Sequence, residues 1–329
     1  MSESPESGGN LRTVILAGVV NLGVAATKGL VGFVTGSAAL LAEAMHSLAD
    51  TTTEVLLFVG LRRGARPPTE QRPFGHDRET YVWALLAAVA TFLIGGGLSI
   101  DEGVEAIRSS ERPQQPLLAY LVILVAAVLE SISLARSVRQ IRARARRFVV
   151  RPLLLVRYGS DTPTKAVFFE DSAALVGLAL AGAGVGLTDL TGNPIWDGLA
   201  SITIGLLLIF VAAVLGYSNI TLLIGRAVPE RGRARIRHEL LAVPAVEQVH
   251  QLLTLYLGPN TILVAAKIDF VSTASSTDVE VAADEAEWRL VALFPTIRYV
   301  FLDPTGGGGS EAYPRRRPDP TEPRYGAGG

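Results

Sequence analysis

Six long apolar stretches constrain the fold of this 329-residue chain more than any other feature. Each contains about the 20 residues that a helix rising 1.5 Å per residue needs to cross roughly 30 Å of hydrocarbon. Hydrophobic residues make up 49% of the chain and charged residues only 19%, a composition that argues against two soluble domains. The sequence therefore predicts a helical membrane protein with six transmembrane helices, over residues 12–34, 38–61, 81–103, 116–136, 164–187 and 195–224.

Basic residues are concentrated in alternate connections between these stretches. The second and fourth connections and the segment after the sixth stretch are rich in Arg, whereas the first and fifth connections contain no Lys or Arg. Because Lys and Arg in short loops stay on the cytoplasmic side, we expect both termini to be cytoplasmic. The strong preference for Arg over Lys suggests a GC-rich bacterial genome, which makes the bacterial plasma membrane the expected location.

An Arg-rich run over residues 136–147 follows the fourth apolar stretch. Such a run is found in nucleic-acid-binding surfaces, but next to a membrane helix it favours contact with phospholipid or a role in orientation. The net charge of −1 provides no overall attraction to nucleic acid. We therefore expect the lipid bilayer, and no nucleic acid, as a partner of this chain.

Short amphipathic patterns replace the long apolar runs after about residue 225. They predict a helix over 231–242, strands over 249–257 and 261–270, a helix from an N-cap at Ser276 or Thr277 to about 294, and a strand over 297–302. This αββαβ order predicts a small, ferredoxin-like α+β cytoplasmic domain. The expected organisation is an N-terminal cytoplasmic tail over 1–11, the membrane domain over 12–225, the α+β domain over 226–305 and a disordered tail over 306–329.

The absence of cysteine excludes disulfides and thiolate metal sites, so any metal ion must be held by His, Asp, Glu, backbone or water. Ionisable residues at membrane depth are costly and usually functional. His46 and Asp50 in the second stretch are i,i+4 neighbours and share one helix face. Imidazole with carboxylate suits a divalent cation such as Zn²⁺. The alternative is a buried polar face on which His46 only forms hydrogen bonds with Asp50 or nearby hydroxyls.

Glu170 and Asp171 stand near the start of the fifth stretch. Asp171 could provide a third metal ligand, and Glu170 or water a fourth. The alternative is that both carboxylates favour the positive end of the helix dipole. A weaker group of candidates for proton relay or gating comprises Asn21, Lys28, Glu43 and Glu130, with Glu130 as a possible partner of Lys28.

With these motifs the chain resembles the cation diffusion facilitator family over residues 12 to about 305. The resemblance rests on the run TGSAALLAEAMHSLAD at 35–50, which is similar to the second-helix signature of the family with its HxxxD. The loop RPFGH at 72–76, the segment Glu-Asp-Ser-Ala at 170–173 and the closing FLDP at 301–304 also match.

The resemblance implies a homodimer with a tetrahedral metal site between the second and fifth helices. It also implies export of a divalent metal from the cytoplasm in exchange for protons by alternating access. The ligand types agree, because His46, Asp50 and Asp171 can bind protons or a dication but not comfortably both. Zn²⁺ is the favoured substrate, with Mn²⁺, Fe²⁺, Co²⁺ and Cd²⁺ left open. No separate cofactor is expected.

Some positions depart from the family pattern. Val167 stands where zinc-selective members have the His of a second HxxxD, and Arg72 replaces the first His of the loop, so His76 is at best part of a loop metal site. In the α+β domain, positions that bind metal in many members hold Lys267, Glu280 and Phe301, whereas His250 and Asp303 match. The chain is most similar to the branch of the family with Glu-Asp in the fifth helix.

Two other functions remain as alternatives. An intramembrane metalloenzyme would need a motif such as HExxH or GxSxG, and the sequence contains neither, so we do not expect an enzyme. A non-transporting membrane subunit with a degenerate metal site is the second alternative, and Val167 is the residue that raises it.

Overall fold

A computed structural model describes residues 22–109, 115–147, 152 and 159–305, which form two compact units. The first unit comprises the described residues up to Arg226 together with Leu257–Asn260, and the second comprises the remainder. The two predicted tails and Asn21 lie outside the described residues.

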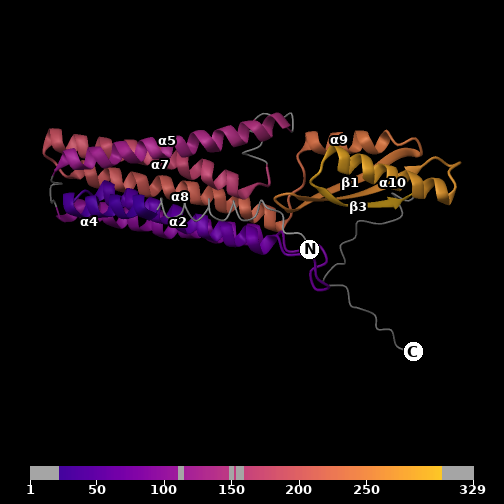
Figure 1. Ribbon diagram of the computed structural model, residues 1–329, viewed down its shortest axis with the longest axis horizontal. Helices are drawn as coiled ribbons and strands as arrows, with labels where there is room; N and C mark the ends of the chain where they lie inside the picture. The colour runs from indigo at the N-terminus through magenta and orange to yellow at the C-terminus, as the bar shows by residue number, and fades with distance from the viewer. Residues whose placement is uncertain (1–21, 110–114, 148–151, 153–158, 306–329) are drawn as a thin grey trace, which may run out of the picture. The chain divides into compact units, whose positions relative to one another are not determined.

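The first unit is a bundle of long helices (Figure 1). Four continuous helical segments are long and apolar enough to cross a membrane: Glu79–Ser109, Pro116–Ala143, Thr162–Thr191 and Ile195–Ile224. Two more helices accompany them: the 27-residue α2, which is less apolar because of its ionisable residues, and a short apolar helix at Leu22–Thr35, the first that the structure describes. The structure thus shows a helical membrane domain, in which six spans remain a prediction. Its labelled elements are α2 (Ala38–Gly64), α3 (Glu79–Ala90), η1 (Thr91–Gly97), α4 (Leu98–Ser109), α5 (Pro116–Arg147), α7 (Thr162–Thr191) and α8 (Ile195–Ile224).

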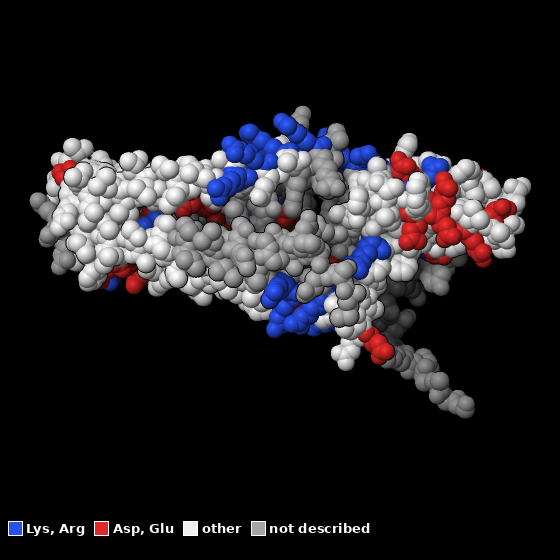
Figure 2. All heavy atoms as spheres, viewed as in Figure 1, with Lys and Arg blue, Asp and Glu red and all other residues white. Residues whose placement is uncertain are grey.

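Basic residues on the surface of the helical unit are concentrated in one region. Figure 2 shows Lys and Arg gathered where α2 and α5 end, whereas much of the remaining visible surface of this unit is uncharged. Arg62 and Arg63 lie in the last turn of α2, and Arg136, Arg139 and Arg142 lie exposed on α5. The basic residues of the second and fourth connections therefore occupy the same end of the bundle, as the positive-inside pattern requires.

A tight turn separates the first described helix from α2. Gly36 has φ of +68°, a backbone conformation that glycine adopts without steric cost. Ser37 is the N-cap of α2, and its hydroxyl donates a hydrogen bond of 2.8 Å to Asp197 at the start of α8. Asp197 also accepts a hydrogen bond of 3.3 Å from the amide of Ala39. This buried carboxylate therefore provides an acceptor for a backbone N–H group that has no partner within the helix. It joins the start of α8 to the start of α2.

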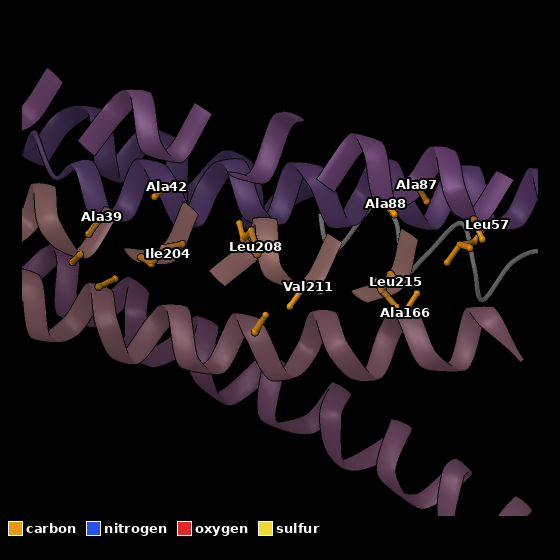
Figure 3. Close-up of a cluster of buried hydrophobic side chains, with 14 residues drawn as sticks. Ala39, Ala42, Leu57, Ala87, Ala88, Ala166, Ile204, Leu208, Val211 and Leu215 are labelled. Carbon is orange, nitrogen blue, oxygen red and sulfur yellow. The ribbon is translucent and has the colours of Figure 1, made fainter. Parts of the chain in front are cut away.

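Helix α8 packs against α2, α3, η1, α4 and α7, while α5 packs against α7. Figure 3 shows the apolar core at these contacts, in which many of the side chains are alanines such as Ala39, Ala42 and Ala88. Helices α4 and α8 approach closely, since a Cβ on Gly103 would come within 2.6 Å of the carbonyl oxygen of Gly198. Small residues thus let these helices approach closely, which is how helices associate where no water is present.

The third predicted span is not a uniform α-helix. Between α3 and α4 the structure contains a π-helical segment, η1, which ends with three consecutive glycines. Glycine has a low preference for the α-helix, and a single wide turn in a helix is frequently found at a functional site. Thr91, the first residue of η1, forms a 3.2 Å hydrogen bond with Thr53 of α2.

The second unit has the predicted element order α9 (Glu230–Leu241), β1 (Val246–Gly258), β2 (Thr261–Phe270), α10 (Ser276–Leu293) and β3 (Ile297–Pro304). The sheet order is β1-β2-β3, and β2 pairs in parallel with β3 from Ile262 opposite Ile297 to Ile268 opposite Pro304. The predicted N-cap of the second helix was wrong by one or two residues. Ser275 caps α10, because its hydroxyl and the Asp278 carboxylate form a reciprocal capping box.

We expect Ser275→Ala to lower the free energy of unfolding of this unit by about 1 kcal/mol at neutral pH. Hydrogen bonds from the hydroxyl and amide of Ser275 lower the pKa of the Asp278 carboxyl. A lowered pKa in the folded state stabilises the fold above the ordinary pKa of the carboxyl and loses this effect as pH falls through the folded value. Chemical unfolding of the full chain at neutral and acidic pH tests both points. Equal stability of Ser275→Ala and the parent at neutral pH would contradict the prediction.

Candidate metal site

Helix α2 places His46 and Asp50 together. The distance between His46 Nε2 and Asp50 Oδ2 is 3.1 Å, and the His46 side chain is 1% exposed and that of Asp50 17%. One helical turn separates the two residues, so the contact follows from their spacing. An imidazole and a carboxylate therefore meet on one buried face of a helix, as predicted.

Helix α7 brings Glu170 and Asp171 to the neighbourhood of this pair. Glu170 accepts a hydrogen bond from Thr53 of α2 and is close enough to His46 and Asp50 to interact electrostatically with both. Asp171 accepts a 3.0 Å hydrogen bond from Ser133 of α5 and also interacts electrostatically with Asp50. All four predicted ligands thus lie in one charged region between α2 and α7, with α5 alongside.

The four side chains do not form a closed metal site. Among the described residues, no three His, Asp or Glu side chains lie close enough together to hold one ion. Four buried atoms of these described residues nevertheless have no hydrogen-bond partner: His46 Nδ1, His46 Nε2, Asp50 Oδ1 and Glu170 Oε1. Buried polar atoms of this kind are costly unless a ligand satisfies them. One imidazole and three carboxylates are a donor set suited to a divalent cation.

Two hydroxyl side chains form hydrogen bonds with the α7 carboxylates. The spacing of charged residues alone does not assign a role to either of them. Thr53 bonds to Glu170, and Ser133 bonds to Asp171. Thr53 lies three residues after Asp50, so the i,i+3 rule could have placed it on the same helix face. No sequence spacing links Ser133 to Asp171, because the contact joins two different helices.

The suggested pairing of Lys28 with Glu130 was wrong. Lys28 Nζ lies 3.1 Å from Glu43 Oε2 and 2.9 Å from Ser47 Oγ, whereas Glu130 interacts with Lys28 only electrostatically. The reason is geometric: Glu43 and Ser47 are i,i+4 neighbours on α2 and present two oxygen atoms on one face to the first described helix.

His76 in the loop before α3 has protein partners. Its Nδ1 atom lies 2.9 Å from Glu79 Oε1 and 3.0 Å from Arg72 Nη1, and Arg72 also pairs with Glu79. The Arg72 guanidinium therefore stands beside the nitrogen and carboxylate that a loop metal ion would use. This arrangement explains how a loop with Arg72 can be held together without an ion.

In the α+β unit, His250 and Asp303, the two residues that match metal-binding positions of the resembled family, have different partners. His250 of β1 lies 3.6 Å from Asp269 of β2, and Asp303 of β3 lies 3.7 Å from Lys267 of β2. Because β2 lies between β1 and β3, His250 and Asp303 are not brought together within the chain.

The fold and this buried charged region define a helical membrane protein with ionisable residues inside its bundle. A family model described as the cation efflux transmembrane domain matches residues 14–224, and the chain therefore belongs to the cation efflux family. It is an integral membrane protein, and the family consists of transporters rather than enzymes, as the sequence predicts.

Relatives in three organisms illustrate the breadth of the family. The chain is 35% identical over 236 residues to the mitochondrial proton-coupled zinc antiporter SLC30A9 of Xenopus laevis, a match that covers 72% of this chain and 42% of that protein. It is 33% identical over 259 residues to metal tolerance protein C4 of Arabidopsis thaliana, covering 79% of this chain and 57% of the relative. The cation-efflux pump FieF of Cronobacter sakazakii is 27% identical over 262 residues, covering 79% and 81%. The chain thus matches less than two thirds of the length of the first two relatives.

Proposed function

We propose that this chain exports a divalent metal ion, with Zn²⁺ favoured, from the cytoplasm in exchange for protons. The observation that carries the proposal is the set of four ionisable residues on α2 and α7, in which four buried atoms of the described residues lack a hydrogen-bond partner. His46, Asp50, Glu170 and Asp171 are the proposed metal ligands. The name of the Xenopus laevis relative, a proton-coupled zinc antiporter, supports both the substrate and the coupling ion.

The proposed exchange follows from the chemistry of these ligands. A nitrogen or carboxylate that binds a dication must first lose its proton, so metal binding releases protons and proton binding releases metal. In the proposed metal-bound state, α7 moves toward α2 and Asp171 leaves Ser133. In the protonated state the carboxylates and imidazole no longer attract the ion. Coupling of these two states to access from opposite sides of the membrane produces antiport.

The proposal includes the arrangement in the membrane. The gathering of Arg at the end of the bundle where α2 and α5 terminate supports a cytoplasmic location for that end, and hence for both termini. Six spans over 12–225, a cytoplasmic α+β domain over 226–305, a homodimer and a bacterial plasma membrane complete the proposal. The resemblance to the Glu-Asp branch of the family supports the homodimer and leaves Mn²⁺, Fe²⁺, Co²⁺ and Cd²⁺ to be compared with Zn²⁺.

Transport in proteoliposomes tests the proposed function. The purified chain is reconstituted with a pH-sensitive dye inside the vesicles, and a panel of divalent metals is added outside. We expect metal-dependent proton flux, fastest with Zn²⁺. Vesicles in which none of the metals changes the proton flux above that of protein-free vesicles would overturn the proposal and would favour a non-transporting subunit.

Glu170→Ala is expected to weaken Zn²⁺ binding by at least about tenfold, because Val167 provides no ligand and a four-coordinate ion then needs Glu170 or water. Titration of the purified protein with Zn²⁺ by calorimetry measures the change. Glu105→Ala, which removes an exposed carboxylate from α4, is the matched control and should bind as the parent does. Unchanged binding by Glu170→Ala would mean that water is the fourth ligand.

A further inference from the structure

Lys28 is a fully buried ammonium group whose two hydrogen-bond partners both come from α2. Its Nζ atom lies 3.1 Å from Glu43 Oε2 and 2.9 Å from Ser47 Oγ. Lys28 and Glu43 are both 0% exposed. A buried ammonium is stable only when it is paired and hydrogen-bonded, so these two oxygen atoms form a small cation site that the lysine occupies.

The surroundings of this site leave one oxygen available. Glu43 Oε1 is buried and has no hydrogen-bond partner among the described residues. It points toward Gly177 of α7, where a side chain would occupy the same space. Glu43 therefore has a second acceptor atom directed at the helix that carries Glu170 and Asp171.

The charged groups of the lysine site interact electrostatically with those of the proposed metal site. His46 lies between Glu43 and Ser47 in the sequence of α2 and interacts electrostatically with both Lys28 and Glu43. Glu130 of α5 also interacts electrostatically with Lys28, Glu43, His46 and Asp50. A dication at His46 and Asp50 would therefore be repelled by the Lys28 ammonium and attracted by the Glu43 carboxylate, which lies about one helical turn before His46 on α2.

We propose that Lys28 is a tethered cation that occupies the Glu43–Ser47 oxygen site and competes with the transported ion for the charge of Glu43. The ammonium lowers the affinity for the metal ion and accelerates its release. Lys28 and Glu43 are thus positioning residues for transport rather than metal ligands of the resting protein. This inference rests on the proposed function, because it needs a divalent ion at His46 and Asp50.

Two single variants separate this role from a structural one, because the expected effects have opposite signs. Lys28→Met removes the repelling charge and frees Glu43, so the dissociation constant for Zn²⁺ should fall about tenfold and the turnover number should fall with it. Glu43→Gln leaves the ammonium without its counter-charge, so the dissociation constant should rise about tenfold. The double variant Lys28→Met/Glu43→Gln removes both charges and should lie between the two. It is also expected to fold, because it buries no unpaired charge.

The controls make each outcome decisive. Lys165→Met removes the buried lysine of α7 that donates to Ser218, and it should not tighten Zn²⁺ binding. Lys28→Arg keeps the charge and should change the affinity less than Lys28→Met does. Calorimetric Zn²⁺ titration, transport in proteoliposomes and a thermal unfolding curve are measured for every variant.

Weaker Zn²⁺ binding by both single variants, or affinities equal to that of the parent, would overturn the tethered-cation proposal. If Lys28→Met does not fold, a double variant that binds Zn²⁺ no more tightly than Glu43→Gln overturns it instead. Absence of Zn²⁺ binding by the parent, or undiminished binding by Asp50→Ala, would reject the proposed metal site and with it the role of Lys28, whatever the Lys28 and Glu43 variants show.

Discussion

Asp50→Ala and Asp171→Ala should each reduce metal-dependent proton flux by about 100-fold or more. Asp50 lies 3.1 Å from His46, and Asp171 is the carboxylate that α7 can deliver to this pair. Removal of either carboxylate takes a negative ligand from a dication in a region of low dielectric, where a unit charge has a large effect on binding. Initial rates of proton flux in proteoliposomes, at equal amounts of reconstituted protein, measure the loss.

Asp189→Ala is the matched control for this prediction. Asp189 is an exposed aspartate near the end of α7, so its removal leaves the region around His46 unchanged. We expect parental flux from this variant. Parental flux from Asp50→Ala or Asp171→Ala would show that the ligand assignment is incorrect even if the chain transports metal.

Gly103→Ala should lower the free energy of unfolding by about 1–3 kcal/mol. The new Cβ would lie 2.6 Å from the carbonyl oxygen of Gly198 and 2.9 Å from the amide nitrogen of Ile202. Both neighbours are backbone atoms of α8, so rotation of a side chain cannot relieve the contact and the two helices must separate. The midpoint of thermal unfolding in detergent measures this effect.

Gly182→Ala tests the same substitution where there is space. A Cβ at Gly182 of α7 would meet only Ile123 at 3.9 Å, an ordinary contact. Because alanine favours the helix more than glycine does, this variant should be as stable as the parent or slightly more stable. Equal losses in the two variants would indicate that the effect of Gly103→Ala comes from the glycine itself and not from the α4–α8 contact.

Contacts within one helix could be predicted from the sequence because the helical repeat determines them. The pair His46 and Asp50 follows directly from an i,i+4 spacing. The N-cap of α10 was predicted at Ser276 or Thr277, one or two residues after the Ser275 that caps it. The order αββαβ was also predictable, since alternating and helical patterns differ clearly in a soluble domain.

Contacts between helices could not be predicted in this way. The partner of Lys28 depends on how the first described helix is rotated relative to α2, and this rotation selects Glu43 and Ser47 rather than Glu130. The same holds for Asp171 and Ser133, which lie on different helices and have no fixed sequence spacing. The π-helical turn at η1 depends both on its glycines and on the packing of Gly96 against α8.

The sequence by itself determined that this chain forms apolar helices followed by a small α+β unit, and it identified the ionisable residues that enter the membrane. Burial of apolar groups and the backbone hydrogen bonds of each helix are local requirements that the residue pattern expresses directly. Only the tertiary structure decided which of these charges meet. It paired Lys28 with Glu43, attached Asp171 to Ser133 and connected Glu170 to α2 through Thr53, because such contacts depend on the packing of whole helices.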